Sequence, residues 1–199
     1  MLNFVIIDTA KHELIVEKSR FIAYISPINS EEDFVSFKKN VKKDAPGARH
    51  YPYAYSYEST ARASDDGEPS GTAGRPLLEL INNHNLNNLA LIVVRYFGGT
   101  LLGAGRLLRT YVDTANQALN LLDKYIVIES QIYEANIKSA DLGQIEYLLA
   151  KNKVEIIKRE YNGEEVRLTF NAEVGLDVEK VYNLQAVKLE RSKLYRKEE

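Results

Sequence analysis

The spacing of apolar and polar residues predicts strands and helices in the first half of the chain. Residues 12–26 have the pattern of two short strands with a break at 17–19. After Ser30, a suitable N-cap, apolar residues recur at helical spacing until Pro46–Gly47. Residues 72–84 and the stretch that follows Gly105 also have helical spacing, whereas 89–94 form a continuous apolar run, typical of a strand buried on both faces.

Tyrosines occupy every second position from Tyr51 to Tyr57, so all four rings belong to one face of a predicted strand. Two interpretations remain open for them. They form either a half-buried sheet face with hydroxyls at its rim, or an exposed platform on which nucleic-acid bases stack. Residues 58–72 that follow are polar and are predicted to be a loop.

A new pattern begins near residue 125. Strands are predicted at 126–136, 154–161, 166–172 and 187–195, with helices at 139–151 and 176–186, and Asn162–Gly163 is a hairpin turn signal. The order βαββαβ is that of a ferredoxin-like domain. We therefore predict an α+β protein with two domains, residues 1–124 and 125–199, and expect the first to fold when expressed alone.

Composition narrows the class of protein. The formal net charge is -2, so binding to nucleic acid needs a local basic patch. The chain has no cysteine, which excludes disulfides, thiolate metal sites and a cysteine nucleophile. It begins without the basic region and long apolar run of a signal peptide, and no apolar stretch reaches membrane-spanning length. We therefore expect a cytoplasmic protein with no membrane partner.

Seven of the eleven glycines lie between Gly67 and Gly105, in two loops that each lead into a helix. Backbone N–H groups at a helix start suit an anion, so we assign four loop residues to a candidate binding site: Gly71, Thr72, Gly98 and Gly99. Tight loop packing without a ligand is an equal alternative. Neither loop matches a nucleotide fingerprint, because Ala104 stands where a P-loop requires lysine.

Asp65, Asp66 and Glu68 place three carboxylates within four residues. A calcium loop needs more regularly spaced oxygens than these, so we predict no metal site and no cofactor. Carboxylates can also hold a loop in shape by contacting a helix start or an arginine. We favour this structural role, with Arg75 and Arg95 among the candidate partners, and we include all five residues in the candidate binding site.

Three basic side chains complete the candidate site. His50 lies among tyrosines, and a hydrolase built from Ser70, His50 and Asp66 would lack a nucleophile elbow, so we assign no catalytic residue. Arg106 and Arg109 fall in the first turns of the long helix, where the dipole end is already positive. Either the acidic loop or an external phosphate must therefore compensate them.

The central stretch resembles a known family. Residues 64–76 read SDDGEPSGTAGRP and are followed by VRYFGG and LGAG, a combination similar to the signature of the IMPACT family of YigZ/YvyE-type proteins. Arg106 departs from the pattern, since the family tends to have glycine there. The resemblance implies an N-terminal domain similar to the second domain of ribosomal protein S5. It also implies a C-terminal domain similar to the terminal domains of elongation factor G.

The resemblance implies a non-enzymatic role in translation control, because eukaryotic relatives compete for the activator of a stress kinase that phosphorylates an initiation factor. For this chain we expect RNA, the ribosome or a translation-factor protein as partner. Two alternatives stay open. One is a small enzyme that acts on a phosphorylated substrate through the Asp65, Asp66 and Glu68 loop and the Gly-rich loops. The other is a module that binds only proteins.

Overall fold

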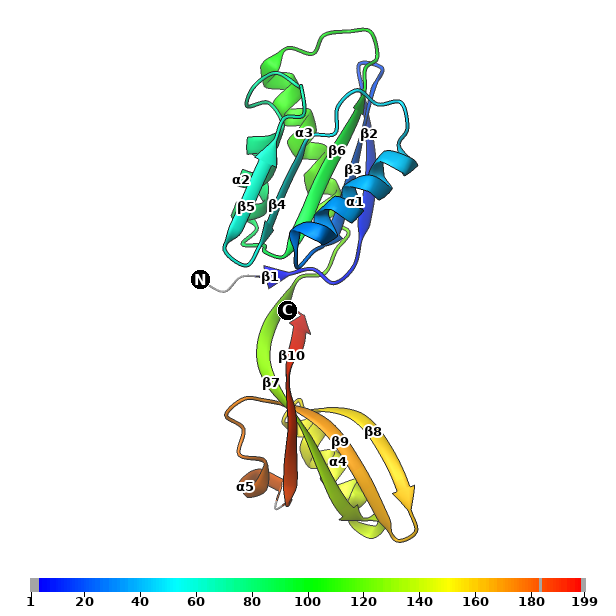
Figure 1. The fold of residues 1–199 in the computed structure, drawn as a ribbon, viewed down its shortest axis with the longest axis vertical. Coiled ribbons are helices and arrows are strands. Elements are labelled where there is room, and N and C mark those ends of the chain that lie inside the picture. Colours follow the sequence, from blue (N-terminus) through cyan, green and yellow to red (C-terminus); the bar gives the residue numbers. More distant parts are fainter. Residues whose placement is uncertain (1–3, 183, 198–199) are drawn as a thin grey trace. The chain divides into compact units, whose positions relative to one another are not determined.

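The computed structural model describes residues 4–182 and 184–197 and shows a mixed α/β chain with two five-stranded sheets (Figure 1). The described residues divide into two compact units, 4–126 with Lys197, and 127–196. The domain boundary that the sequence predicts, after residue 124, lies close to this division. Residues 1–3, 183 and 198–199 of the predicted domains lie outside the described residues.

An antiparallel sheet with the strand order β2-β3-β6-β4-β5 is the frame of the first unit. Its central strand β6 is buried over its first six residues, as the continuous apolar run predicts. The strands are β2 (Ala10–Val16), β3 (Ser19–Pro27), β6 (Leu89–Tyr96), β4 (Tyr53–Tyr57) and β5 (Thr60–Ser64).

Strand β5 corrects the sequence analysis, which expected a loop over residues 58–72. Residues 60–64 pair with β4 in a regular antiparallel register. Their small and polar side chains are mostly exposed, so they carry no apolar alternation. Backbone pairing with β4 makes this segment an edge strand, and that pairing is not encoded in its own side chains.

Helices cover both faces of this sheet (Figure 1). Helix α1 (Glu31–Asp44) covers one face, and α2 (Gly74–Asn83) and α3 (Ala104–Leu119) cover the other. Ser30 caps α1 as predicted, because its side chain accepts the backbone N–H of Asp33 at 3.1 Å. The sheet therefore has a separate apolar core on each side.

The tyrosine-rich strand packs under α1. Tyr55 is 1% exposed, and the Phe34 ring of α1 lies 4.3 Å from its ring centroid and 4.8 Å from that of Tyr53. The interpretation as a half-buried sheet face is therefore right. The interpretation as an exposed base-stacking platform is wrong, because α1 covers the rings.

The second unit has the element order βαββαβ that its sequence pattern predicts. The pattern did not predict β1 (Phe4–Val5), which pairs with Tyr125 and Ile126 of β7 in the first unit. Apart from Tyr125, Ile126 and Lys197, which belong to the first unit, the second unit consists of β7 (Tyr125–Lys138), a 3-10 turn (Ser139–Asp141), α4 (Leu142–Lys151), β8 (Glu155–Asn162), β9 (Glu165–Glu173), α5 (Val178–Tyr182) and β10 (Ala186–Lys197).

No helix in the described ranges is long and apolar enough to cross a bilayer.

Candidate binding site

The carboxylate of Asp65 lies at the start of α2. It accepts the backbone N–H groups of Gly71 at 2.9 Å, Ala73 at 2.9 Å and Gly74 at 2.8 Å. Burial alone raises the pKa of Asp65, but the bonds from these three N–H groups outweigh burial and leave the pKa below its usual value. The sequence left an external anion and tight packing without a ligand as equal alternatives for this loop, and the structure shows that the loop supplies its own carboxylate to these N–H groups.

Asp66 fixes the segment before β4. Its carboxylate accepts the backbone N–H of Tyr51 at 2.8 Å and lies 3.8 Å from the ammonium group of Lys38. Its carbonyl oxygen lies 2.7 Å from Nδ1 of His50. Because a carbonyl oxygen only accepts, Nδ1 of His50 carries the proton. A side chain at position 67 would come within 2.8 Å of the His50 ring, so Gly67 allows this contact.

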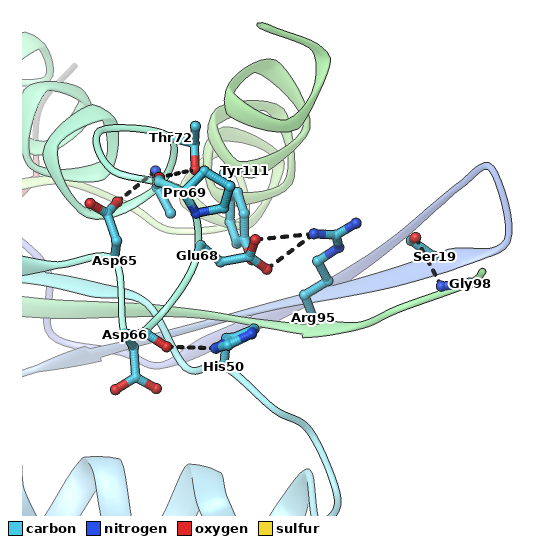
Figure 2. Close-up of polar contacts among 11 residues, drawn as sticks. Ser19, His50, Asp65, Asp66, Glu68, Pro69, Thr72, Arg95, Gly98 and Tyr111 are labelled. Atoms are coloured by element: carbon cyan, nitrogen blue, oxygen red, sulfur yellow. Dashed lines mark hydrogen bonds and ion pairs between the residues drawn. The ribbon is translucent and has the colours of Figure 1, made fainter. Parts of the chain in front are cut away.

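Glu68, Arg95 and Tyr111 form a buried charge cluster (Figure 2). Nη1 of Arg95 donates to both carboxylate oxygens of Glu68, at 3.2 and 3.1 Å, and the Tyr111 hydroxyl donates to Oε1 at 2.8 Å. The Glu68 side chain is 3% exposed and the Arg95 side chain 10%. Burial, and then the negative charge of Glu68, raise the pKa of the Tyr111 hydroxyl far above its usual range, so this hydroxyl remains a donor.

The second glycine-rich loop packs against the turn between β2 and β3. The N–H of Gly98 donates to Oγ of Ser19 at 3.1 Å, and a side chain at Gly98 would collide with the backbone of Lys18 and Ser19. In the same turn, Glu17 accepts from Nη1 of Arg106 at 2.8 Å. Glu17 therefore compensates Arg106, where the sequence analysis expected the acidic loop or an external phosphate.

A cavity of about 610 Å³ opens beside the buried charge cluster. Arg49, His50 and Arg95 supply its basic groups, and the start of α3 at Gly103 and Ala104 forms one side. Phe97 and Leu101 are among the large apolar side chains of its wall. A volume of this size is typical of a small-molecule site, which holds roughly 300–1,000 Å³. The lining residues are 47–50, 67–69, 95–97, 101–104 and 107.

The predicted site residues are brought together only in part. His50, Glu68 and Arg95 line the cavity, and Gly98, Gly99 and Arg106 belong to the adjoining loop and helix start. Asp66 contacts His50, whereas Asp65, Gly71 and Thr72 belong to the closed loop before α2.

Two of the predicted arginines stand apart from the cavity lining. Arg75 is exposed and pairs with Glu79 at 3.0 Å on α2. Arg109 is exposed on α3.

Sequence reasoning missed Tyr111, Arg49, Phe97 and Leu101. Tyr111 falls within the helical pattern that follows Gly105, and because a buried tyrosine needs a partner for its hydroxyl, this residue could have indicated a polar contact. The other three residues carry no local signal, because their proximity depends on the tertiary fold. In the described part of the chain, no group of three or more histidine, aspartate or glutamate residues could hold a metal ion.

The fold and cavity define a class of α/β protein with an arginine-lined pocket at one end of a doubly covered sheet. The Impact N-terminal domain family model matches residues 17–119. The chain is 37% identical to the IMPACT family member YvyE of Bacillus subtilis over 75% of this chain and 70% of that protein. It is 34% identical to the IMPACT family member YigZ of Escherichia coli over 73% and 74% of the two chains.

A solved structure agrees over nearly the whole length. The crystal structure of a hypothetical protein matches with a TM-score of 0.64 and 29% identity, covering 96% of this chain and 98% of the other. The chain therefore belongs to the IMPACT family, as its central motif indicates.

Proposed function

We propose that this chain is a cytoplasmic regulator of translation that binds single-stranded RNA through a surface on its first unit, without catalysis. Membership of the IMPACT family supports the role in translation. The observation that carries the proposal is the exposed start of α3, which has no side-chain cap, with an exposed aromatic ring in the loop before it and two exposed arginines in its first turns. Phe97 is 54% exposed in the loop after β6, Arg109 is exposed on α3, and Arg106 is exposed there although Glu17 pairs with it at 2.8 Å.

RNA fits this surface better than the other partners considered. Bases stack on exposed aromatic rings, and phosphates are attracted to arginines and to the positive end of a helix. Gly103 precedes α3 and has no side chain that could cap it. A chain with net charge -2 needs such a local surface for RNA binding. We name the exposed residues Phe97, Arg106 and Arg109 the RNA surface.

An enzymatic role has less support, because the carboxylates it requires are engaged in structure. Asp65 accepts three backbone N–H groups, Asp66 accepts the N–H of Tyr51, and Glu68 accepts from Arg95 and Tyr111. A general base or metal ligand must have free lone pairs directed at a substrate or ion. These carboxylates instead hold the loop between β5 and α2 in shape.

Binding to fluorescent single-stranded RNA over a series of salt concentrations tests the proposal. The double variant Arg106→Ala, Arg109→Ala should bind more weakly and show a shallower salt dependence, because two phosphate contacts are lost. Phe97→Ala should weaken binding at every salt concentration by removing a stacking contact, worth about 1–3 kcal/mol per base. Arg75→Ala is the matched control, since Arg75 is an exposed arginine on a different helix.

The result that would overturn RNA binding is unchanged affinity and salt slope in both the double variant and Phe97→Ala. A pull-down from lysate with and without nuclease separates the protein-partner alternative, because a partner retained after nuclease treatment is held by protein contacts. Turnover of a phosphoester that requires Mg²⁺ would favour the enzymatic alternative instead.

We also propose the finer domain assignments that the family resemblance implies. The strand order β10-β7-β9-β8, with neighbouring β7, β9 and β8 antiparallel, supports a ferredoxin-like second domain similar to the terminal domains of elongation factor G. The first domain would be similar to the second domain of ribosomal protein S5. Residues 1–124 and 125–199 remain the proposed domain limits.

A further inference from the structure

Arg95 is enclosed on three sides. The Phe21 and Phe97 rings lie 5.5 and 5.4 Å from its guanidinium carbon, one ring from β3 and one from the end of β6. Nη1 is taken by the Glu68 carboxylate. Figure 2 shows the Glu68 carboxylate facing the guanidinium group of Arg95.

The Nε group of Arg95 is buried and has no hydrogen-bond partner among residues 4–182 and 184–197. In a guanidinium group, Nε and one terminal nitrogen form a fork that matches the two oxygens of a carboxylate or phosphate. Because Glu68 contacts Nη1, the fork that includes Nε is not the one used by Glu68. A buried N–H without a partner costs free energy, so an acceptor that reached it would bind favourably.

The surroundings of Arg95 suit an anion with an apolar body. Arg95 lines the 610 Å³ cavity together with Arg49 and His50, and the start of α3 lies on the same cavity. Among the described residues that line the cavity, Glu68 supplies the one carboxylate, and Arg95 already neutralises it. Leu102 and Leu107 also line the cavity and extend its apolar wall.

We propose that this cavity is a binding site for a small organic acid, with a carboxylate or phosphate head on a compact apolar body. The head accepts from the free fork of Arg95 and is attracted by Arg49 and by the start of α3. The apolar body packs against the leucine-lined wall. The site differs from the RNA surface in its ligand, and it would exist even if the chain bound no RNA.

Benzoate and phenyl phosphate are suitable probes, with benzamide as the neutral analogue and inorganic phosphate as the head group alone. We expect saturable shifts of the Ala104 and Gly105 amide signals in nuclear magnetic resonance titrations with at least one of the two aromatic acids. Benzamide and inorganic phosphate should each bind about tenfold or more weakly, since each lacks one of the two contacts.

Three variants test the placement. Arg49→Glu reverses an exposed charge at the cavity, and Ala104→Trp fills the cavity from the exposed start of α3. Each should weaken binding of the better acid by about tenfold or more. Arg95→Lys keeps the positive charge beside Glu68 but removes the fork. If this variant folds, it should also bind the better acid about tenfold or more weakly. Arg75→Ala should bind as the wild type does.

The proposal is overturned if neither acid binds saturably, or if benzamide binds as tightly as the acids. It is also overturned if Arg49→Glu and Ala104→Trp retain wild-type affinity. These two variants change exposed positions, so the test does not depend on whether Arg95→Lys folds. A wild-type protein that binds the acids but does not bind RNA would count against the RNA surface alone.

Discussion

At the scale of single residues, the buried Glu68 carboxylate explains why this end of the sheet is ordered. A buried carboxylate is tolerated only when a cation and hydrogen-bond donors surround it. Arg95 supplies the cation from β6, and Tyr111 supplies a donor from α3. The carboxylate thus connects the acidic loop, the central strand and the long helix.

Removing one donor from Glu68 should destabilise the first unit. Tyr111→Phe should lower the free energy of unfolding by about 1–3 kcal/mol, because a buried charged acceptor is left short of a donor. Glu68→Ala should cost about 3–5 kcal/mol, because it leaves the Arg95 charge buried and unpaired. Urea unfolding followed by circular dichroism measures both.

The matched control is Tyr147→Phe, since Tyr147 is 68% exposed on α4 and should change stability little. If Tyr111→Phe unfolds at the same urea concentration as the wild type, the hydrogen bond to Glu68 contributes nothing to stability and the cluster has been misassigned.

Asp65 should make stability depend on pH. Its folded pKa is below the unfolded value, so its contribution is present above the unfolded pKa and is lost as the pH falls through the folded pKa. Asp65→Ala should cost about 0.5–2 kcal/mol near neutral pH, as the loss of a helix cap does. Melting temperatures from neutral to acidic pH should show the gap between variant and wild type narrowing. A gap that stays constant on acidification would contradict this role.

At the scale of elements, the second glycine-rich loop depends on close backbone contact. Gly98→Ala should destabilise the first unit by about 1–3 kcal/mol, because the added carbon collides with the backbone of Lys18 and Ser19. Gly105→Ala is the control in the adjoining helix, where the added carbon meets nothing within 4 Å. That change should stabilise α3 by about 0.5–1 kcal/mol. Thermal unfolding that ranks the two variants in the opposite order would contradict this explanation.

Sequence periodicity predicted the elements whose side chains carry the signal. The cap at Ser30, the buried strand β6 and the βαββαβ order were all readable, because apolar spacing and capping residues are local properties. Strands β1 and β5 could not be predicted from periodicity. Strand β1 has only two residues, and β5 has exposed polar side chains.

The candidate site was predictable to a smaller extent than the elements. The glycines and carboxylates could be singled out by type, and the internal role of the carboxylates follows from their chemistry. The contact between Glu17 and Arg106 spans 89 positions of sequence and depends on a turn in which Glu17 and Lys18 both have positive φ. No local pattern encodes such a contact, and the same holds for the meeting of Arg49 with Phe97 and Leu101 around the cavity.

At the scale of the whole molecule, the chain should be separable near the predicted boundary. The fragment 1–124 should fold, because the first unit has its own sheet and cores. The fragment 1–126 should melt a few degrees higher, because Tyr125 and Ile126 pair with Phe4 and Val5. Circular dichroism during heating compares the two. Unfolded fragments, or a shorter fragment that is the more stable, would contradict the proposed boundary.

The two helix starts beside the glycine-rich loops differ in one respect that affects their amide protons. Asp65 holds the N–H groups of Gly71, Ala73 and Gly74, whereas α3 begins at Ala104 after a residue with no side chain. Amide protons that are hydrogen-bonded exchange with deuterated solvent only when the structure opens locally. The start of α2 should therefore retain its protons far longer than the start of α3. Fast exchange at Ala104 and Gly105 would report how often this end of the helix is open to water, and slower exchange with benzoate present would report its occupation.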